Sequence, residues 1–165
     1  MKIIDRLNED RINISFEVFP PKTKAGFDSV IKAVDEIAML EPAFISVTYG
    51  AGGGTSSNTV HIASHIKHDL QVESLAHLTC VSSTKEQVHE MISTLKEEGI
   101  ENILALRGDI PKETEFPIAG RYRYACELIR EIKQQGDFCI GAACYPEGHV
   151  ENEHKKDDIQ YLKEK

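Results

Sequence analysis

Short apolar runs alternate with longer segments of helical periodicity along the whole sequence. The runs are rich in Ile, Val and Phe and are bounded by Pro, Gly or polar residues, as short buried strands are. They predict strands at residues 14–19, 44–48, 74–79, 103–106 and 138–144. Between the runs, apolar residues recur every three or four positions, as on one face of a helix. The helices that this spacing predicts cover residues 27–38, 58–69, 84–95, 122–134 and the last dozen residues.

Three helix ends carry their own signals. Thr84 and Gln87 have the spacing of a capping box, in which each side chain binds the backbone N–H of the other residue. Gly99 stands where a glycine commonly ends a helix. The fourth helix, over residues 122–134, is closed in the same way by Gly136.

The predicted strands begin about 30 residues apart, which is typical of successive βα units and requires a parallel sheet. Two architectures compete, an open doubly wound sheet and a (β/α)8 barrel. An open sheet concentrates its ligand residues at one switch point, whereas a barrel collects them from many strands at one rim. Reactive side chains close all five predicted strands: Glu17, Thr48 with Tyr49, His77, Arg107 with Asp109, and Tyr145 with His149. We therefore expect an α/β fold of the parallel (β/α)8 TIM barrel type.

A complete barrel of this type has eight units and about 250 residues. The sequence holds about five units and stops at Lys165, inside a predicted helix. We therefore expect residues 1–165 to be a single incomplete barrel domain. No linker or low-complexity stretch suggests a second domain.

Net charge and composition limit the kinds of molecule that the protein is expected to bind. The net charge is -8 with only 19 Lys and Arg residues, which argues against binding to nucleic acid or to a membrane surface. No apolar run approaches the ~18 residues of a membrane span, and the N-terminus lacks the pattern of a secretory signal. We expect a cytoplasmic protein. Its four cysteines form no Cys-x-x-Cys pair, so we expect buried thiols and no metal site. Metal ligation by Cys139 and Cys144 is the alternative, although no partner pair stands at zinc-site spacing.

Glu17 is the sharpest local candidate for chemistry. It alternates with Phe16 and Val18 in the first strand, so in a barrel its side chain would point into the interior. A carboxylate there would lose hydration, which raises its pKa and lets it act as a general acid. A structural ion pair with an arginine such as Arg107 is an equally weighted alternative.

Arg107, Gly108 and Asp109 follow the fourth strand. A guanidinium can bind phosphate or carboxylate through two hydrogen bonds, glycine admits a ligand close to the backbone, and aspartate can stabilise a cation. A simple turn from strand to loop explains the same three residues equally well. The glycine-rich run at residues 50–56 offers backbone amides to a phosphate, with a flexible turn as its alternative.

Three histidines, His61, His65 and His68, share one face of the second predicted helix. Metal binding would need this spacing and a further oxygen or sulfur ligand. Because the apolar stripe that includes Ile62 and Ile66 should turn inward, we expect the histidines to lie at the solvated surface.

Five short pieces of the sequence form a set. They are Phe-Glu-Val-Phe-Pro-Pro at 16–21, Val-Thr-Tyr-Gly-Ala-Gly-Gly at 47–53, Ala-His-Leu-Thr-Cys at 76–80, Ala-Leu-Arg-Gly-Asp at 105–109 and Tyr-Pro-Glu-Gly-His at 145–149. One such piece could arise by chance, whereas five in this order and spacing are highly specific. Together they resemble the catalytic domain of the methylenetetrahydrofolate reductase family over nearly the whole chain.

The resemblance implies a (β/α)8 barrel that carries FAD at its C-terminal rim. It implies that NAD(P)H supplies electrons through the flavin to 5,10-methylenetetrahydrofolate, which gives 5-methyltetrahydrofolate. Glu17 matches the family's general acid, which opens the folate's five-membered ring, and Asp109 matches an aspartate that contacts the flavin and the folate and stabilises the cation. Thr48 matches a residue close to the nicotinamide and the flavin. Further matches to FAD contacts are Tyr49, Ala51, His77, Arg107, Gly108, Ala125, Tyr145, His149, Asp158 and Lys165.

The resemblance also implies that the complete protein forms homo-oligomers. A competing interpretation is a truncated, catalytically silent barrel fragment that only binds flavin or a partner chain, since an unclosed barrel exposes two edge strands. A barrel aldolase with a Schiff-base lysine is disfavoured, because no lysine lies within a predicted strand.

Overall fold

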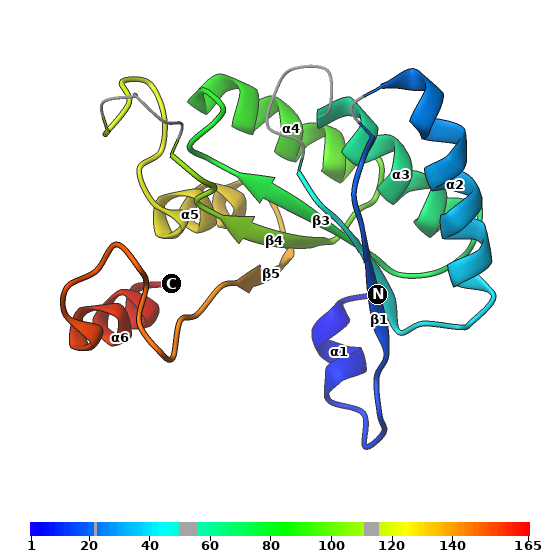
Figure 1. Ribbon diagram of the computed structural model, residues 1–165, viewed down its shortest axis with the longest axis horizontal. Coiled ribbons are helices and arrows are strands. Elements are labelled where there is room, and N and C mark those ends of the chain that lie inside the picture. Colours follow the sequence, from blue (N-terminus) through cyan, green and yellow to red (C-terminus); the bar gives the residue numbers. More distant parts are fainter. Residues whose placement is uncertain (22, 50–55, 111–115) are drawn as a thin grey trace.

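Strands and helices alternate along the chain, as Figure 1 shows for the computed structural model, which describes residues 1–21, 23–49, 56–110 and 116–165. The strands are β1 (Ser15–Val18), β2 (Phe44–Val47), β3 (Ser74–Thr79), β4 (Asn102–Leu106) and β5 (Cys139–Ala142). The helices are α1 (Ile3–Leu7), α2 (Lys24–Ala38), α3 (Ser56–His68), α4 (Lys85–Glu97), α5 (Ala125–Gln135) and α6 (Lys155–Glu164). Every element expected from the apolar periodicity is present, and within these described ranges only α1 was not expected.

The strands form one parallel sheet in the order β1-β2-β3-β4-β5. A doubly wound sheet reverses its strand order at a switch point, whereas a barrel adds each strand beside the preceding one. The order found here follows the chain without reversal. It confirms the barrel-like (β/α) fold that the distribution of polar residues predicted.

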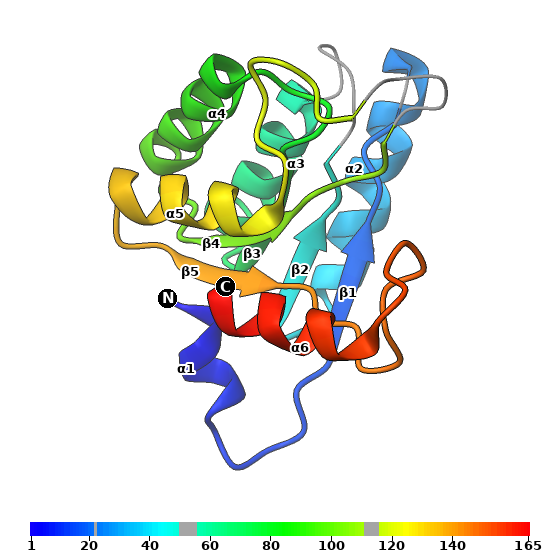
Figure 2. The same cartoon turned by 90° about the vertical axis from the view of Figure 1, so that its left-hand side faces the viewer.

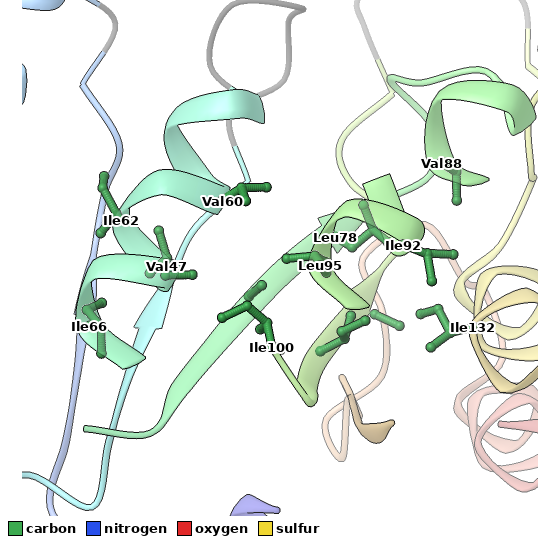
Figure 3. Packing of buried hydrophobic residues seen from close by; sticks show 14 of the residues in the cluster. Val47, Val60, Ile62, Ile66, Leu78, Val88, Ile92, Leu95, Ile100 and Ile132 are labelled. Carbon is green, nitrogen blue, oxygen red and sulfur yellow. The ribbon is translucent and has the colours of Figure 1, made fainter. Parts of the chain in front are cut away.

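One face of the sheet carries the hydrophobic core. Val47 of β2, Leu78 of β3 and Ile103 of β4 are fully buried beneath the helices. The apolar stripes of α3 and α4 add Ile62 and Ile92 to this layer, and Figure 3 shows core side chains from helices and strands packed together. Burying each such side chain contributes about 1.5–3 kcal/mol, so this layer fixes the sheet and the positions of its strand ends.

The opposite face is the inner face of the barrel-like sheet. Strand register and alternation place Glu17, Ser46, His77 and Leu104 on it. Helix α6 lies on this side, across the sheet from α2 and α3 (Figure 2). The Glu17 side chain is exposed, so the expected loss of its hydration is wrong. The physical reason is its position, because β1 is an edge strand and has a neighbouring strand on one side only.

Helix ends agree in part with their sequence signals. The capping box of α4 is confirmed: the Gln87 backbone N–H donates to Thr84 Oγ1, and the Thr84 N–H donates to Gln87 Oε1. Gly99 follows α4 with φ +66°, in the left-handed region expected of a closing glycine. Helix α5 begins three residues later than Tyr122, where the sequence placed its start. In the part of the chain that the structure describes, no helix is both long and apolar enough to cross a bilayer.

The short helix α1 is attached through Asn102, the first residue of β4, to the end of the sheet where the strands begin. The Ile3 N–H donates to Asn102 Oδ1 at 2.8 Å, and the amide group of Asn102 donates to the carbonyls of Met1 and Ser74. Asn102 is buried, so these bonds satisfy a side chain that would otherwise destabilise the sheet. They hold the end of the sheet that lies away from the candidate site.

Candidate functional site

The carboxyl ends of the strands border a cavity of about 930 Å³. This volume lies in the upper part of the range for small-molecule sites, about 300–1,000 Å³. Parallel strands all present their carboxyl ends at one edge, so residues far apart in the sequence meet there. Eleven of the expected site residues line the cavity: Thr48, Tyr49, His77, Arg107, Gly108, Asp109, Ala125, Tyr145, His149, Asp158 and Lys165. Ala51 lies outside the described residues.

The two carboxylates expected to serve catalysis, Glu17 and Asp109, lie at the same end of the sheet. Glu17 is the third residue of the four in β1, and Asp109 comes three residues after the last residue of β4. Both side chains are exposed. Asp109 lines the cavity, whereas Glu17 is not part of its described lining. The structure therefore gathers most of the expected cofactor residues around the cavity, and Glu17 lies on the inner face of the sheet outside the described lining.

His77 lies on the same face of the sheet as Glu17 and lines the cavity. Its side chain lines the cavity from β3 and is only 8% exposed. Burial lowers the pKa of His77, and the negative charge of Glu17 acts in the opposite direction. The ring is therefore neutral at neutral pH. A neutral imidazole offers a ligand one N–H donor and one nitrogen acceptor.

Arg107 at the end of β4 makes a two-pronged ion pair across the cavity. Its Nη1 and Nη2 donate to the two carboxylate oxygens of Glu151 at 2.6 and 2.9 Å. The hydrogen bond to Glu151 raises the pKa of Arg107, and the same bond lowers the pKa of Glu151. The alternative in which Arg107 pairs with Glu17 is wrong, because Glu151 occupies the fork of the guanidinium.

Gly108 makes the turn that follows β4. Its φ is +84°, a conformation that favours glycine. A Cβ at this position would lie 3.1 Å from side-chain atoms of both Thr79 and Val81. The Val81 N–H donates to the Arg107 carbonyl at 2.9 Å, which ties the segments after β3 and β4 together. Because Gly108 has no Cβ, the backbone after β4 can pack closely against Thr79 and Val81 in this part of the cavity wall.

The segment after β5 closes the cavity from the other side. The rings of Tyr145 and His149 meet edge to face, with their centroids 4.7 Å apart. Asp158, in the first turn of α6, accepts the backbone N–H of His149 at 2.8 Å. Lys165 donates to the carbonyl of Ala143 at 2.9 Å. These bonds position the segment and the helix against each other.

Sequence reasoning missed part of the lining. The additional polar and aromatic lining residues include Tyr124, Arg130, Cys144, Glu151 and Asn152. Tyr124 had a usable signal, since it directly precedes Ala125, which the family resemblance had singled out. Glu151 had none, because its partner lies 44 positions away along the chain.

The three histidines of α3 do not form a metal site. Within the described ranges, no group of three His, Cys, Asp or Glu side chains is placed to hold a metal ion. His65 is partly buried and bridges two carboxylates, with its Nε2 2.8 Å from Asp35 and its Nδ1 2.7 Å from Asp69. Burial is the largest single influence and lowers the pKa of His65, but the two carboxylates together outweigh it and raise the pKa above its ordinary value.

The cysteines differ from one another in burial. Cys80 is fully buried, and burial raises the pKa of its thiol to about 12. Cys126 and Cys139 are partly buried, and Cys144 is exposed. The expectation of buried thiols is therefore correct for Cys80 and wrong for Cys144. The exposed position follows from the place of Cys144 after the last residue of β5, where the strand has left the sheet.

Comparisons with known proteins bear on this arrangement. The family model described as methylenetetrahydrofolate reductase matches residues 2–165. A 5,10-methylenetetrahydrofolate reductase of Pectobacterium carotovorum subsp. carotovorum is 40% identical over 157 residues, which cover 95% of this chain and 51% of that protein. The enzyme of the same name from Escherichia coli (strain K12) is 36% identical, over 95% of this chain and 52% of that protein.

A plant protein extends the similarity. The probable methylenetetrahydrofolate reductase (NADH) of Oryza sativa subsp. japonica is 36% identical over 182 residues, which cover 100% of this chain and 31% of that protein. The chain thus spans about half the length of the two bacterial relatives and about a third of the plant relative. Because the family model matches nearly every residue, the chain belongs to the methylenetetrahydrofolate reductase family.

Proposed function

We propose that the full-length protein reduces 5,10-methylenetetrahydrofolate to 5-methyltetrahydrofolate, with FAD as cofactor and NAD(P)H as electron donor. One observation carries the proposal: eleven residues that the family resemblance assigns to this chemistry line a single cavity at one edge of the sheet. We also propose that the enzyme acts in the cytoplasm as a homo-oligomer. The relatives' names support the reaction and, for the plant relative, NADH as donor.

The residues of the cavity suit a large anionic cofactor such as FAD. The guanidinium of Arg107 already holds an anion, the Glu151 carboxylate, by two hydrogen bonds, and phosphate oxygens accept the same geometry. Gly108 leaves the backbone open to close approach. Thr48, Tyr49, His77 and the segment that includes Tyr145 and His149 would complete the walls. FAD, when bound, supplies the acceptance and delivery of hydride, and the protein supplies binding and electrostatics.

The chain's own carboxylates carry the proton and charge steps in this proposal. Glu17 donates a proton to the folate nitrogen that leaves when the five-membered ring opens, which yields an electrophilic iminium. Its exposure on the inner face leaves it open to an incoming substrate. Asp109, at the same end of the sheet, places a negative charge near the developing cation, and this stabilises it. His77, neutral and buried, orients the ligand from the floor of the cavity.

An absorbance spectrum of the purified full-length protein tests the proposal. We expect flavin bands that bleach when NADH or NADPH is added under anaerobic conditions and return when 5,10-methylenetetrahydrofolate follows. An aldehyde added in place of the folate serves as the control, and it should not restore the flavin bands. A protein that takes up no FAD, or whose reduced flavin ignores the folate, would contradict the proposed function.

A further inference from the structure

The ion pair between Arg107 and Glu151 joins two separate parts of the cavity wall. Arg107 ends β4, and its side chain is 18% exposed, whereas Glu151 lies in the segment between β5 and α6 and its side chain is 50% exposed. Both residues line the cavity. The ion pair therefore connects the end of β4 with the segment after β5 and occupies the guanidinium donors of Arg107 that line the cavity.

Glu151 belongs to a hydrogen-bonded unit that ends at α6. Its backbone N–H donates to His149 Nδ1 at 3.2 Å, and the N–H of His149 donates to Asp158 at 2.8 Å. Asn152 Nδ2 donates to the other carboxylate oxygen of Asp158 at 3.0 Å. The backbone of the segment is thus held by its own bonds to α6, and the Glu151 side chain can leave Arg107 without dismantling that segment.

The charges of the cavity lining determine how strongly the Arg107–Glu151 ion pair affects the binding of an anionic ligand. The described lining carries five carboxylates, on Asp109, Glu127, Glu151, Asp158 and Glu164, and three permanent cations, on Arg107, Arg130 and Lys165. While Glu151 occupies the donor fork of Arg107, that fork is not free to bind an anionic ligand. A phosphate group can bind Arg107 in the same two-pronged manner only if the Glu151 carboxylate withdraws.

We propose that Glu151 is an internal competitor for the anion site of Arg107, a latch that a diphosphate-bearing ligand must displace to bind in the cavity. The inference rests on the proposed function in one respect, the identity of that ligand as FAD. The anion site itself depends only on the geometry of Arg107 and Glu151. Glu151 therefore sets the affinity of the site as well as its selectivity for ligands with strong oxyanions.

Binding of inorganic pyrophosphate to the flavin-free full-length protein, followed by titration calorimetry, tests the latch. Glu151→Gln should tighten pyrophosphate binding about three- to tenfold, the scale of a partly exposed ion pair in good geometry. Glu153→Gln removes an equal charge from an exposed side chain of the same segment and is the matched control. It should leave the affinity within about twofold, since a solvent-exposed charge is well screened.

Two further variants keep the test decisive. Glu151→Asp retains the charge but shortens the side chain, so its gain should fall between wild type and Glu151→Gln. Adding Arg107→Gln to Glu151→Gln should abolish the gain. Equal affinities for Glu151→Gln and Glu153→Gln, or no pyrophosphate binding by any variant, would overturn the latch. If pyrophosphate follows the expected pattern and FAD fluorescence shows no binding, the latch stands and the flavin assignment fails.

Discussion

Glu17 on β1 and His77 on β3 share the inner face of the sheet, with β2 between their strands, and the carboxylate acts electrostatically on the imidazole. Burial lowers the pKa of His77, and the Glu17 charge partly offsets that effect. The expected general acid therefore influences a cavity residue although it is not itself part of the described cavity lining.

Replacing Glu17 by Gln should lower the pKa of His77 further. The substitution removes the negative charge that favours the imidazolium form and leaves the burial that disfavours it. An NMR titration of the His77 ring in wild type and Glu17→Gln measures the change. Glu36→Gln, an exposed carboxylate on α2, is the control and should leave the His77 titration unchanged. An unshifted His77 in Glu17→Gln would show that the two groups do not interact.

Gly108→Ala should destabilise the fold more than Gly120→Ala does. Both glycines have positive φ, +84° and +74°, so each substitution costs about 1–2 kcal/mol of backbone strain. A Cβ at Gly108 would also lie 3.1 Å from Thr79 and Val81, whereas a Cβ at Gly120 would meet nothing within 4 Å. Urea unfolding of the two variants separates strain from crowding. Equal losses in the free energy of unfolding would mean that Thr79 and Val81 move aside for the added Cβ at no energetic cost.

The bridge from His65 to Asp35 and Asp69 should stabilise the fold most at mildly acidic pH. The folded-state pKa of His65 is raised above its ordinary 6.5, so the folded chain binds the proton more tightly than the unfolded chain. This contribution is fully present below pH 6.5 and is lost as the pH rises through the folded-state pKa. Because the Asp35 side chain is 49% exposed and the Asp69 side chain 68%, solvent screening limits it to about 0.5–1 kcal/mol.

Thermal melts of wild type and His65→Gln at pH 6 and pH 9 measure this contribution. The variant should lose stability at pH 6 and match wild type more closely at pH 9. His61→Gln is the control, because His61 on the same helix faces the ring of Phe27 and not a carboxylate. A loss that is the same at both pH values would exclude a role for the protonated ring.

Much of the fold could be predicted from the sequence because its signals are local. The apolar runs gave all the strands, and Thr84 with Gln87 gave a helix start that the structure confirms. Helix α1 was missed because five residues are too short for a period of 3.6 to show, and its position depends on Asn102, far along the chain. The start of α5 was misplaced because Tyr124 makes no side-chain capping bond.

The site could be predicted only as far as strand ends determine it. Alternation and the barrel winding were enough to bring Thr48, His77 and Asp109 to one edge. The exposure of Glu17 was not foreseen, because burial on the inner face depends on neighbours across the sheet and not on alternation alone. The partner of Arg107 was not foreseen either, because the segment that carries Glu151 has no periodic pattern to locate it.

In the proposed mechanism, Glu17 serves the folate half of the reaction and not the reduction of the flavin. Anaerobic stopped-flow absorbance of the full-length Glu17→Gln variant tests it most directly, with Glu36→Gln as the control. We expect the flavin to be reduced by NADH or NADPH at nearly the wild-type rate, and its reoxidation by 5,10-methylenetetrahydrofolate to be abolished. Equal loss of both half-reactions, or normal reoxidation by the folate, would contradict the role assigned to Glu17.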